Sequence, residues 1–336
     1  MRRGLAIIVL LIPLLWTTWG WQEVSRNHQQ MVRFVDIAPT ADEVGPSGDV
    51  TGLGPFRLEG LWRMTSPNSR FGGWSAMIDV GTGQFLAFSD RNMRVRFTPP
   101  GMATPDIPRA KQVGIRRAIY QRKRDGDWEV FDIESAVLAP DSSIWFGLED
   151  EDGLIRIDAD RAKGAFVPIP ALKDWPVNGG PEAMTRLTDG RWMLLCETCG
   201  ARRGGLHLGL VFADTPDRSQ PQPFGIELPV GFDPVDMAPL PDGRLLILTR
   251  RLSLIPPHFE SRLVLADPAK LDPKRPWQAQ ELARIDTSAL RENYEAMVVK
   301  VTPAGPEVWL LSDENGSAIQ ETRLMKLRLD MARLPH

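Results

Sequence analysis

The chain has 336 residues, of which 43% are hydrophobic and 25% charged, and its formal net charge at pH 7 is −3. This composition is that of a folded globular protein and excludes wholesale disorder. Because nucleic-acid binding needs a basic face, the near-neutral charge predicts no nucleic-acid partner.

The N-terminal segment differs from the rest of the chain. Arg2 and Arg3 precede an apolar run that starts at Leu5 and is followed by tryptophans up to Trp21. A positive end before a short apolar core is typical of a secretory signal, but no A-x-A cleavage pattern follows it. We therefore predict that residues 1–21 are either a signal peptide or an uncleaved anchor that holds the protein to the inner membrane through residues 5–21. In both cases we expect an exported, periplasmic protein, with a linker over residues 22–54.

Five later segments share one plan, in which a polar residue opens an apolar strand that turns back into a second apolar strand. They are "SAMIDVGTGQFLAFSD" from Ser75, "ESAVLAPDSSIWFGLED" from Glu134, "EAMTRLTDGRWMLLCE" from Glu182, "DMAPLPDGRLLILTR" from Asp236 and "EAMVVKVTPAGPEVWLLSD" from Glu295. Asp-Gly pairs at 189–190 and 242–243 supply the backbone conformation that a tight hairpin requires. The pattern indicates a repeated β-hairpin.

Further strand-like stretches follow these hairpins, which gives about four strands for each repeat of roughly 50 residues, a spacing typical of β-propeller blades. The last repeat has three strands, and residues 56–64 before the first repeat supply the fourth. We predict an all-β protein with a single β-propeller over residues 55–330 and a short tail at 331–336. Five four-stranded blades are counted, or six if residues 92–128 hold another, and pairing of 56–64 with the C-terminal blade closes the ring.

In a propeller the innermost strands start at one mouth of the central channel, so the five polar residues would meet there. The second strands would end on the same side, with Asp90, Arg91, Glu149, Glu197, Arg250, Arg251, Asp313 and Asn315 at or near their ends. Two interpretations remain open for the acids: they fasten neighbouring blades through backbone N–H groups, or they hold a divalent cation. The position of Asp236 is uncertain by one residue, because its turn comes one residue earlier than that of Glu182.

Both cysteines lie close together, as Cys196 and Cys199. In an exported protein this spacing is typical of a small disulfide loop. Two thiols are too few for a structural zinc site, so we predict a local disulfide.

Several motifs together resemble one known family. They are "RFGGWSAM", "DIESAVLAPDSSIW", "NGGPEAMTRLTDGRWMLL", "PVDMAPLPDGRLLIL", "NYEAMVV" and "LLSDENGSAIQETRLMKLRL", in order from about residue 55 to 330. The chain thereby resembles the phytase-like family, also described as "esterase-like activity of phytase" proteins. The resemblance implies an exported propeller that hydrolyses phosphate or other esters, and it matches family positions at Glu134, Glu182, Asp236, Glu295, Asp313 and Asn315. The chain departs from the family at Glu314 and Gly316 and in its cysteine pair.

The residues favour metal-assisted hydrolysis over a serine esterase. "GWSAM" around Ser75 lacks the second glycine of a G-x-S-x-G elbow, and none of the four histidines is placed to act as its base. A cation held by carboxylates could activate water, and arginines could hold phosphate oxygens. The predicted metal ligands are Glu134, Glu182, Asp236 and Glu295, with Ca²⁺ first and Mg²⁺ or Mn²⁺ as alternatives; the predicted catalytic residues are Glu182, Glu295 and Asp313; the predicted substrate contacts are Arg91, Arg250, Arg251 and Asn315.

The predicted partner is thus a small-molecule ester or phosphate ester. Two alternatives stay open: a periplasmic binding or scaffold propeller without catalysis, and a lactonase-like hydrolase with a single metal ion. The sequence leaves the oligomeric state open.

Overall fold

The computed structural model describes residues 31–39, 43–44, 50–102, 114–119, 132–159, 164–200, 205–317 and 319–335. The predicted signal or anchor at residues 1–21 lies outside these residues. No helical segment among the described residues combines the length and the apolar character that a membrane span requires.

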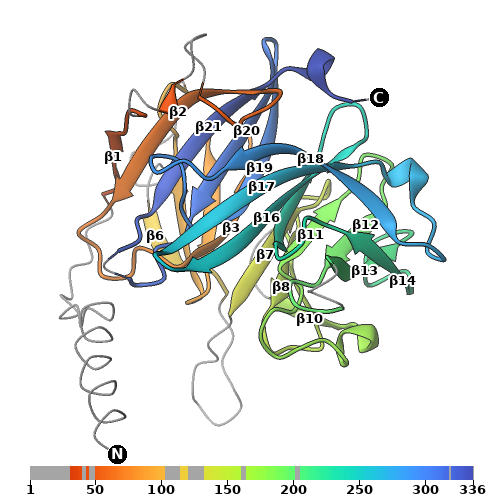
Figure 1. The fold of residues 1–336 in the computed structure, drawn as a ribbon. Helices are drawn as coiled ribbons and strands as arrows, with labels where there is room; N and C mark the ends of the chain where they lie inside the picture. The colour runs from red at the N-terminus through yellow and green to blue at the C-terminus, as the bar shows by residue number, and fades with distance from the viewer. Residues whose placement is uncertain are drawn as a thin grey trace, which may run out of the picture.

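The described residues form four sheets, and because the eight-stranded one consists of two four-stranded units, they make five blades, which we number in chain order (Figure 1). Blade 1 contains β3 (Trp74–Asp79), β4 (Phe85–Ser89), β5 (Met93–Phe97) and β6 (Gly114–Arg117). Blade 2 contains β7 (Ile133–Leu138), β8 (Ile144–Leu148), β9 (Gly153–Ile157) and β10 (Gly164–Pro168). Blade 3 contains β11 (Ala183–Arg186), β12 (Trp192–Leu195), β13 (Leu206–Phe212) and β14 (Pro221–Glu227).

Blades 4 and 5 complete the ring. Blade 4 contains β15 (Asp233–Pro239), β16 (Leu245–Leu254), β17 (Pro257–Ala266) and β18 (Trp277–Ile285). Blade 5 contains β19 (Tyr294–Thr302), β20 (Gly305–Ser312), β21 (Arg323–Leu329), β2 (Phe56–Thr65) and β1 (Arg33–Asp36). A short parallel pairing of β14 with β18 joins the outer edges of blades 3 and 4. Short 3₁₀ turns occur at Pro170–Leu172, Pro268–Lys270 and Met331–Arg333.

The N-terminal strand closes the propeller, as the sequence predicted. β2 pairs antiparallel with β21, from Phe56 opposite Leu329 to Arg63 opposite Arg323. Because the first and last strands share one sheet, the closing blade has no free edge between the chain ends. Residues 33–36, predicted as linker, form β1 at the outer edge of this blade. The predicted tail is also part of the fold, since Leu334 is buried in the core.

Apolar side chains fill every interface between neighbouring blades. The buried residues fall into five clusters, and each cluster combines residues of two adjacent blades, including blades 5 and 1. Aromatic pairs bridge four of these interfaces: Phe88–Phe146, Trp145–Trp192, Phe224–Trp277 and Phe85–Trp309. The innermost strands contact one another in the order β3, β7, β11, β15, β19 and back to β3. The described residues therefore form a closed ring of five blades.

A β-bulge near the start of the inner strand recurs in four blades. The ladder skips one residue at Ser75, Glu134, Val235 and Glu295. A bulged residue is left out of the pairing and its side chain is re-aimed. In blade 3 the first ladder pair is Ala183 with Leu195, so Glu182 lies just before the strand. This explains why an otherwise buried strand opens on a carboxylate.

Candidate functional site

A cavity of about 430 Å³ lies where the inner strands begin and the second strands end. All five blades or the loops between them contribute to its wall. The lining residues are Asp90, Glu134, Glu149, Asn178, Gly179, Glu182, Glu197, Thr198, Arg250, Glu295, Asp313 and Asn315. Six of the predicted site residues are therefore brought together: Glu134, Glu182, Arg250, Glu295, Asp313 and Asn315.

Glycines bring the backbone close to the acids of this cavity. Gly73 and Gly179 have φ angles of +70° and +87°, which residues with a side chain rarely adopt. A Cβ atom on Gly73 would collide with the Asp90 carboxylate, and one on Gly179 would approach Glu197 to 2.9 Å. The "FGG" and "NGG" sequences before blades 1 and 3 thus leave room for these carboxylates.

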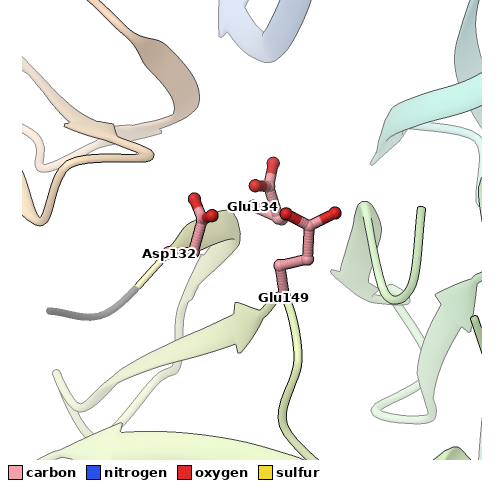
Figure 2. Close-up of side chains that lie close together, drawn as sticks. All are labelled: Asp132, Glu134 and Glu149. Carbon is pink, nitrogen blue, oxygen red and sulfur yellow. The ribbon is translucent and has the colours of Figure 1, made fainter. Parts of the chain in front are cut away.

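Three carboxylates of blade 2 point toward one opening (Figure 2). One oxygen each of Asp132, Glu134 and Glu149 lies within 4.8 Å of the others. Asp132 and Glu134 flank the first residue of β7, and Glu149 follows β8. The Gly179 N–H donates to Glu149 Oε1 at 3.1 Å. Three oxygen ligands at this separation suit a hard divalent cation such as Ca²⁺ or Mg²⁺.

The sequence pattern did not assign Asp132 and Glu149 to this group. Asp132 lies two residues before Glu134, a spacing that brings both side chains to the bulge. For Glu149 the sequence predicted only that it lies on the same side of the propeller as the other acids. The signal was the pattern Asp-x-Glu at the start of the first strand combined with Glu at the end of the second. The other predicted ligands, Glu182 and Glu295, belong to neighbouring parts of the same cavity.

The carboxyl groups on the acidic side of the cavity have raised pKa values. Burial, followed by repulsion from Glu182, raises the pKa of Glu134 well above its ordinary value. Burial, followed by repulsion from Glu197, does the same to Glu182. Burial also raises the pKa of Glu149 to about 7. Such a group of acids is stabilised either by bound protons or by a cation, and the two compete for the same oxygens.

Arg250 forms the centre of the opposite wall. Its Nη1 donates to Asn293 Oδ1 at 2.7 Å and to Glu295 Oε1, and its Nη2 donates to Glu197 Oε1 at 3.2 Å. Asn293 Nδ2 in turn donates to Glu295 Oε1 at 2.7 Å. Burial raises the pKa of Glu295 to about 7, although the Arg250 guanidinium acts to lower it. Arg250 is therefore a partner that joins Glu197 of blade 3 to Glu295 of blade 5.

A third group consists of Asp90 and Asp313. Burial, with repulsion from Asp313, raises the pKa of Asp90 to about 7. Burial, with repulsion from Glu314, raises the pKa of Asp313 to about 6. Arg91 lies beside them, with Nε at 3.6 Å from Asp90 Oδ1 and about half of its side chain exposed. Asn315 Nδ2 donates to Gln320 at 3.0 Å.

Buried carboxylate oxygens without a hydrogen-bond partner mark this cavity. Among the described residues, Asp90 Oδ1 and Asp313 Oδ1 of the cavity lining are buried and receive no hydrogen bond, and the same holds for Asp132 Oδ1 in the carboxylate cluster beside it. Leaving such an acceptor unsatisfied costs about 1–3 kcal/mol, and more for a charged group. The cavity thus presents oxygens whose partners would be a cation, a proton or a ligand donor.

The prediction for Asp236 needs a correction of one residue. The bulge in β15 falls at Val235, so Val235 takes the position that Glu134 and Glu295 hold in their blades. The Asp236 carboxylate is instead buried away from the cavity. It accepts from the Met237 N–H at 2.7 Å and from the Met297 N–H of blade 5 at 2.6 Å. Asp236 therefore fastens blades 4 and 5 through backbone N–H groups, which is the first of the two interpretations given for the acids.

Ser75 and Arg251 also lie outside the cavity. Ser75 Oγ donates to the Ile133 carbonyl, and Ser135 Oγ donates to the Pro181 carbonyl at 2.8 Å, so both serines fasten neighbouring blades. The Arg251 guanidinium pairs with Glu260 at 2.7 Å and lies over the Phe232 ring. The described residues that line the cavity include no histidine.

The predicted disulfide is confirmed. Cys196 and Cys199 are bonded, with their Cα atoms 5.5 Å apart. The two residues between them, Glu197 and Thr198, line the cavity. The disulfide therefore closes the loop that presents Glu197 to Arg250.

Replacing Asp236 by asparagine tests whether this residue joins blades 4 and 5 or binds a metal ion. In the variant, the asparagine NH₂ group would face the N–H group of Met237 or Met297, so two hydrogen-bond donors would oppose each other. We therefore expect the free energy of unfolding to fall by about 1–3 kcal/mol. Because Asp236 does not line the cavity, any rise in melting temperature produced by a divalent cation should be unchanged. Thermal unfolding with and without cation checks both points, and a lost cation response would return Asp236 to the ligand set.

The raised carboxyl pKa values predict how stability depends on pH when no cation is bound. An acid whose pKa is higher in the folded state binds more protons when folded, so stability falls as pH rises from about 4.5 to about 7. The relevant groups are Asp90, Glu149 and Glu295, each with a pKa raised to about 7. In chelator we expect a melting temperature at pH 8 at least about 2–4 °C below that at pH 5.5. A melting temperature that rises over this range would contradict the raised values.

The comparisons with known proteins agree with the fold. The family model "Phytase-like: Esterase-like activity of phytase" matches residues 69–316. No protein with a curated description matches the chain. Among solved structures, an endo-arabinase from Bacteroides thetaiotaomicron is 10% identical with a TM-score of 0.51, covering 78% of this chain and 96% of its own. A "GH43, Beta 1,3 Galactosidase" is 11% identical with a TM-score of 0.51, covering 88% and 60%.

A virginiamycin B lyase from Staphylococcus aureus is 12% identical with a TM-score of 0.44, covering 89% of this chain and 100% of its own. At these identities the likeness to the solved structures concerns the β-propeller fold alone. The family match spans more than half of the chain and covers blades 1 to 4 together with strands β19 and β20 of blade 5. The chain therefore belongs to the phytase-like family, whose description is "esterase-like activity of phytase".

Proposed function

We propose that this protein is a metal-dependent hydrolase of phosphate or other esters that acts in the acidic cavity at the mouth of the channel. The observation that carries the proposal is the convergence of Asp132, Glu134 and Glu149 on one opening, where a buried oxygen of Asp132 lacks a partner. Membership of the phytase-like family supports ester hydrolysis as the reaction class.

The acids of blade 2 would hold the cation, with Glu182 beside them. Carboxylate oxygens are the ligands of Ca²⁺, Mg²⁺ and Mn²⁺, and Ca²⁺ tolerates the irregular geometry of a loop-based site best. A bound cation would supply Lewis acidity to a phosphoryl or carbonyl oxygen. Glu295, which the sequence placed among the ligands, is engaged by Arg250 and Asn293 and would orient that wall instead.

The carboxyl groups across the cavity would handle protons. Hydrolysis adds water to the phosphorus or carbonyl carbon, and the departing ester oxygen takes a proton. Burial raises the pKa of Asp313 to about 6 and that of Asp90 to about 7, so either carboxyl group could take up or release a proton near neutral pH. Glu182, whose pKa burial raises well above its ordinary value, would be a further proton holder next to the cation ligands.

Arg91 is better placed than Arg250 to contact a substrate phosphate. Among the described contacts its ion pair is the 3.6 Å approach to Asp90, and half of its side chain is exposed. Arg250 is held by Glu295, Glu197 and Asn293 and would have to leave them. A partly exposed guanidinium at the rim suits bidentate contact with a phosphate that arrives from solvent.

The test is a chelation and add-back experiment. The protein is stripped with chelator, Ca²⁺, Mg²⁺ or Mn²⁺ is returned, and phosphate monoesters, phytate, carboxyl esters and lactones are assayed in parallel. We expect turnover of one ester class that disappears with chelator and returns with cation. Turnover that survives chelation and the Glu134→Gln change would overturn the metal mechanism. A ligand that stabilises the protein without product would instead favour a binding propeller.

A further inference from the structure

Apolar side chains gather on the mouth face of the propeller. The exposed large apolar residues of its loops and hairpin ends are Val177, Val230, Leu252, Leu254, Ile255 and Ile319. On the opposite face, among the described residues, the exposed large apolar side chain is Val301 at the β19–β20 turn. The others belong to strands β1, β10 and β13 or precede β1: Met31, Val35, Phe166 and Leu208. Exposed apolar groups gathered on one face mark an interaction surface more often than scattered ones do.

The β16–β17 hairpin carries the most prominent of these residues. β15 starts opposite Arg250 of β16, but β16 continues to Leu254 and pairs with β17 as far as Pro257 (Figure 1). The second strands of blades 1, 2 and 3 have four or five residues, whereas β16 has ten. The hairpin therefore projects roughly 15 Å past the start of the inner strand. Ile255 at its tip is 94% exposed and Leu254 is 70% exposed.

The apolar face of this hairpin is continuous with the cavity. Side chains alternate along a strand, so Leu252 and Leu254 share a face with Arg250, which lines the cavity. Phe259 lies opposite Leu252 in β17, and its ring is 5.7 Å from the Arg250 guanidinium. The hairpin thus extends an apolar surface outward from the acidic cavity.

The chain also enters the propeller on this face. β1 is antiparallel to β2, and Arg33 lies opposite Thr65, where β2 ends on the mouth side. The apolar run of residues 5–21 precedes Arg33, and the residues between them number eleven, 22–32. Such a segment spans at most about 40 Å when fully extended. A membrane-held N-terminal segment would therefore be tethered next to the apolar hairpin.

We propose that the mouth face of this propeller lies against a lipid bilayer, with the tip of the β16–β17 hairpin inserted at the headgroup level. Two separate observations support it: the apolar loops share one face, and Arg33, which the sequence separates from the apolar N-terminal run by eleven residues, lies on that same face. The inserted groups are uncharged, so the attachment depends on apolar burial and is little affected by salt. The acids of the cavity oppose anionic lipid, which makes zwitterionic vesicles the suitable partner.

Site-specific labelling tests this orientation. The chain has two cysteines and both are in the disulfide, so an introduced cysteine is its single free thiol. The full-length protein is prepared with Leu254→Cys, Ile319→Cys or Val301→Cys, labelled with an environment-sensitive fluorophore and mixed with phosphatidylcholine vesicles that carry a lipid-bound quencher. Val301 is the matched control, because it is an apolar residue with 65% exposure on the opposite face.

We expect quenching at Leu254→Cys and Ile319→Cys at least about threefold greater than at Val301→Cys, because interfacial groups reach only 5–10 Å or so into the bilayer. The difference should persist in 0.5 M salt. At this ionic strength the Debye length is roughly 4–5 Å, so interactions between surface charges are largely screened. Equal quenching at all three sites, greater quenching at Val301→Cys, or no quenching at Leu254→Cys would each overturn the proposal. The proposal does not depend on hydrolysis, which is assayed separately with soluble substrates.

Discussion

Replacing Glu134 by glutamine is expected to abolish the stabilisation of this protein by a divalent cation. At a cation concentration of about 100 times Kd the unchanged protein should gain about 2.7 kcal/mol in unfolding free energy. That gain corresponds to a rise of about 5–10 °C in melting temperature for a domain of this size. Loss of a residue that hydrogen-bonds to a metal ligand lowers metal affinity about 10–100-fold. Because Glu134 is a proposed ligand itself, its replacement should lower the affinity for the cation at least about 100-fold.

The same change should act in the opposite direction on the cation-free protein. Glu134 is one of several buried acids whose pKa burial raises well above its ordinary value. A neutral glutamine removes that charge without changing the size of the side chain, so the cation-free protein should be more stable at pH 8 than the unchanged one. A variant that is merely misfolded would lose stability under both conditions.

Asp158→Asn is the matched control for this experiment. Asp158 follows β9 in the same blade, is 64% exposed and pairs with Arg156. It does not line the cavity, so its replacement should leave both the cation response and the turnover unchanged. If Glu134→Gln kept the full cation response, the cation would have to bind elsewhere, and the proposed ligand group would be wrong.

Replacing Arg250 by alanine is expected to have the largest effect on stability. Arg250 is the cation that holds Glu295, Glu197 and Asn293 together across the cavity, and its side chain is 18% exposed. Removal of one partner from a buried ion pair costs about 3–5 kcal/mol, because the remaining charges are left without compensation. We expect a fall of this size in the free energy of unfolding, measured with chemical denaturant at pH 7.5.

The neighbouring arginine provides the control. Arg251 pairs with Glu260 and is 41% exposed, so its replacement by alanine should cost less than about 1 kcal/mol. Adding Glu295→Gln to Arg250→Ala should recover part of the lost stability, since it removes the charge that Arg250 compensated. If Arg250→Ala cost no more than Arg251→Ala, the ion pairs of Arg250 would not hold the cavity wall.

The fold was predictable because its signals are local and repeated. The hairpins beginning near Ser75, Glu134, Glu182 and Glu295 each contain their own alternation, turn residues and spacing. Closure by residues 56–64 followed from counting strands, since a propeller with three strands in its last blade would leave an exposed edge. The short strand β1 was missed because its four residues carry no pattern that separates them from a linker.

The candidate site was predictable only in part. Glu134, Glu182 and Glu295 were identified because a carboxylate at the start of an apolar strand conflicts with burial unless it has a partner. Asp236 looked equivalent, and a bulge at Val235 turned it toward Met297 instead of the cavity. Asp132 gave no signal of its own, because an acid just before a strand is ordinary in a loop.

The sequence by itself determined the propeller fold, the closing strand, the cysteine pair and the face on which the acids gather, and it left five or six blades open. Strand periodicity, turn chemistry and cysteine spacing act over a few residues, so each can be read without knowing what lies across the channel. Only the tertiary structure decided which acids share one opening and which one fastens two blades. That choice depends on one-residue bulges and on contacts between segments 45 to 61 residues apart, such as Arg250 with Glu295 and Asp236 with Met297. Contacts of that kind form when neighbouring blades pack against each other, so no local sequence pattern predicts them.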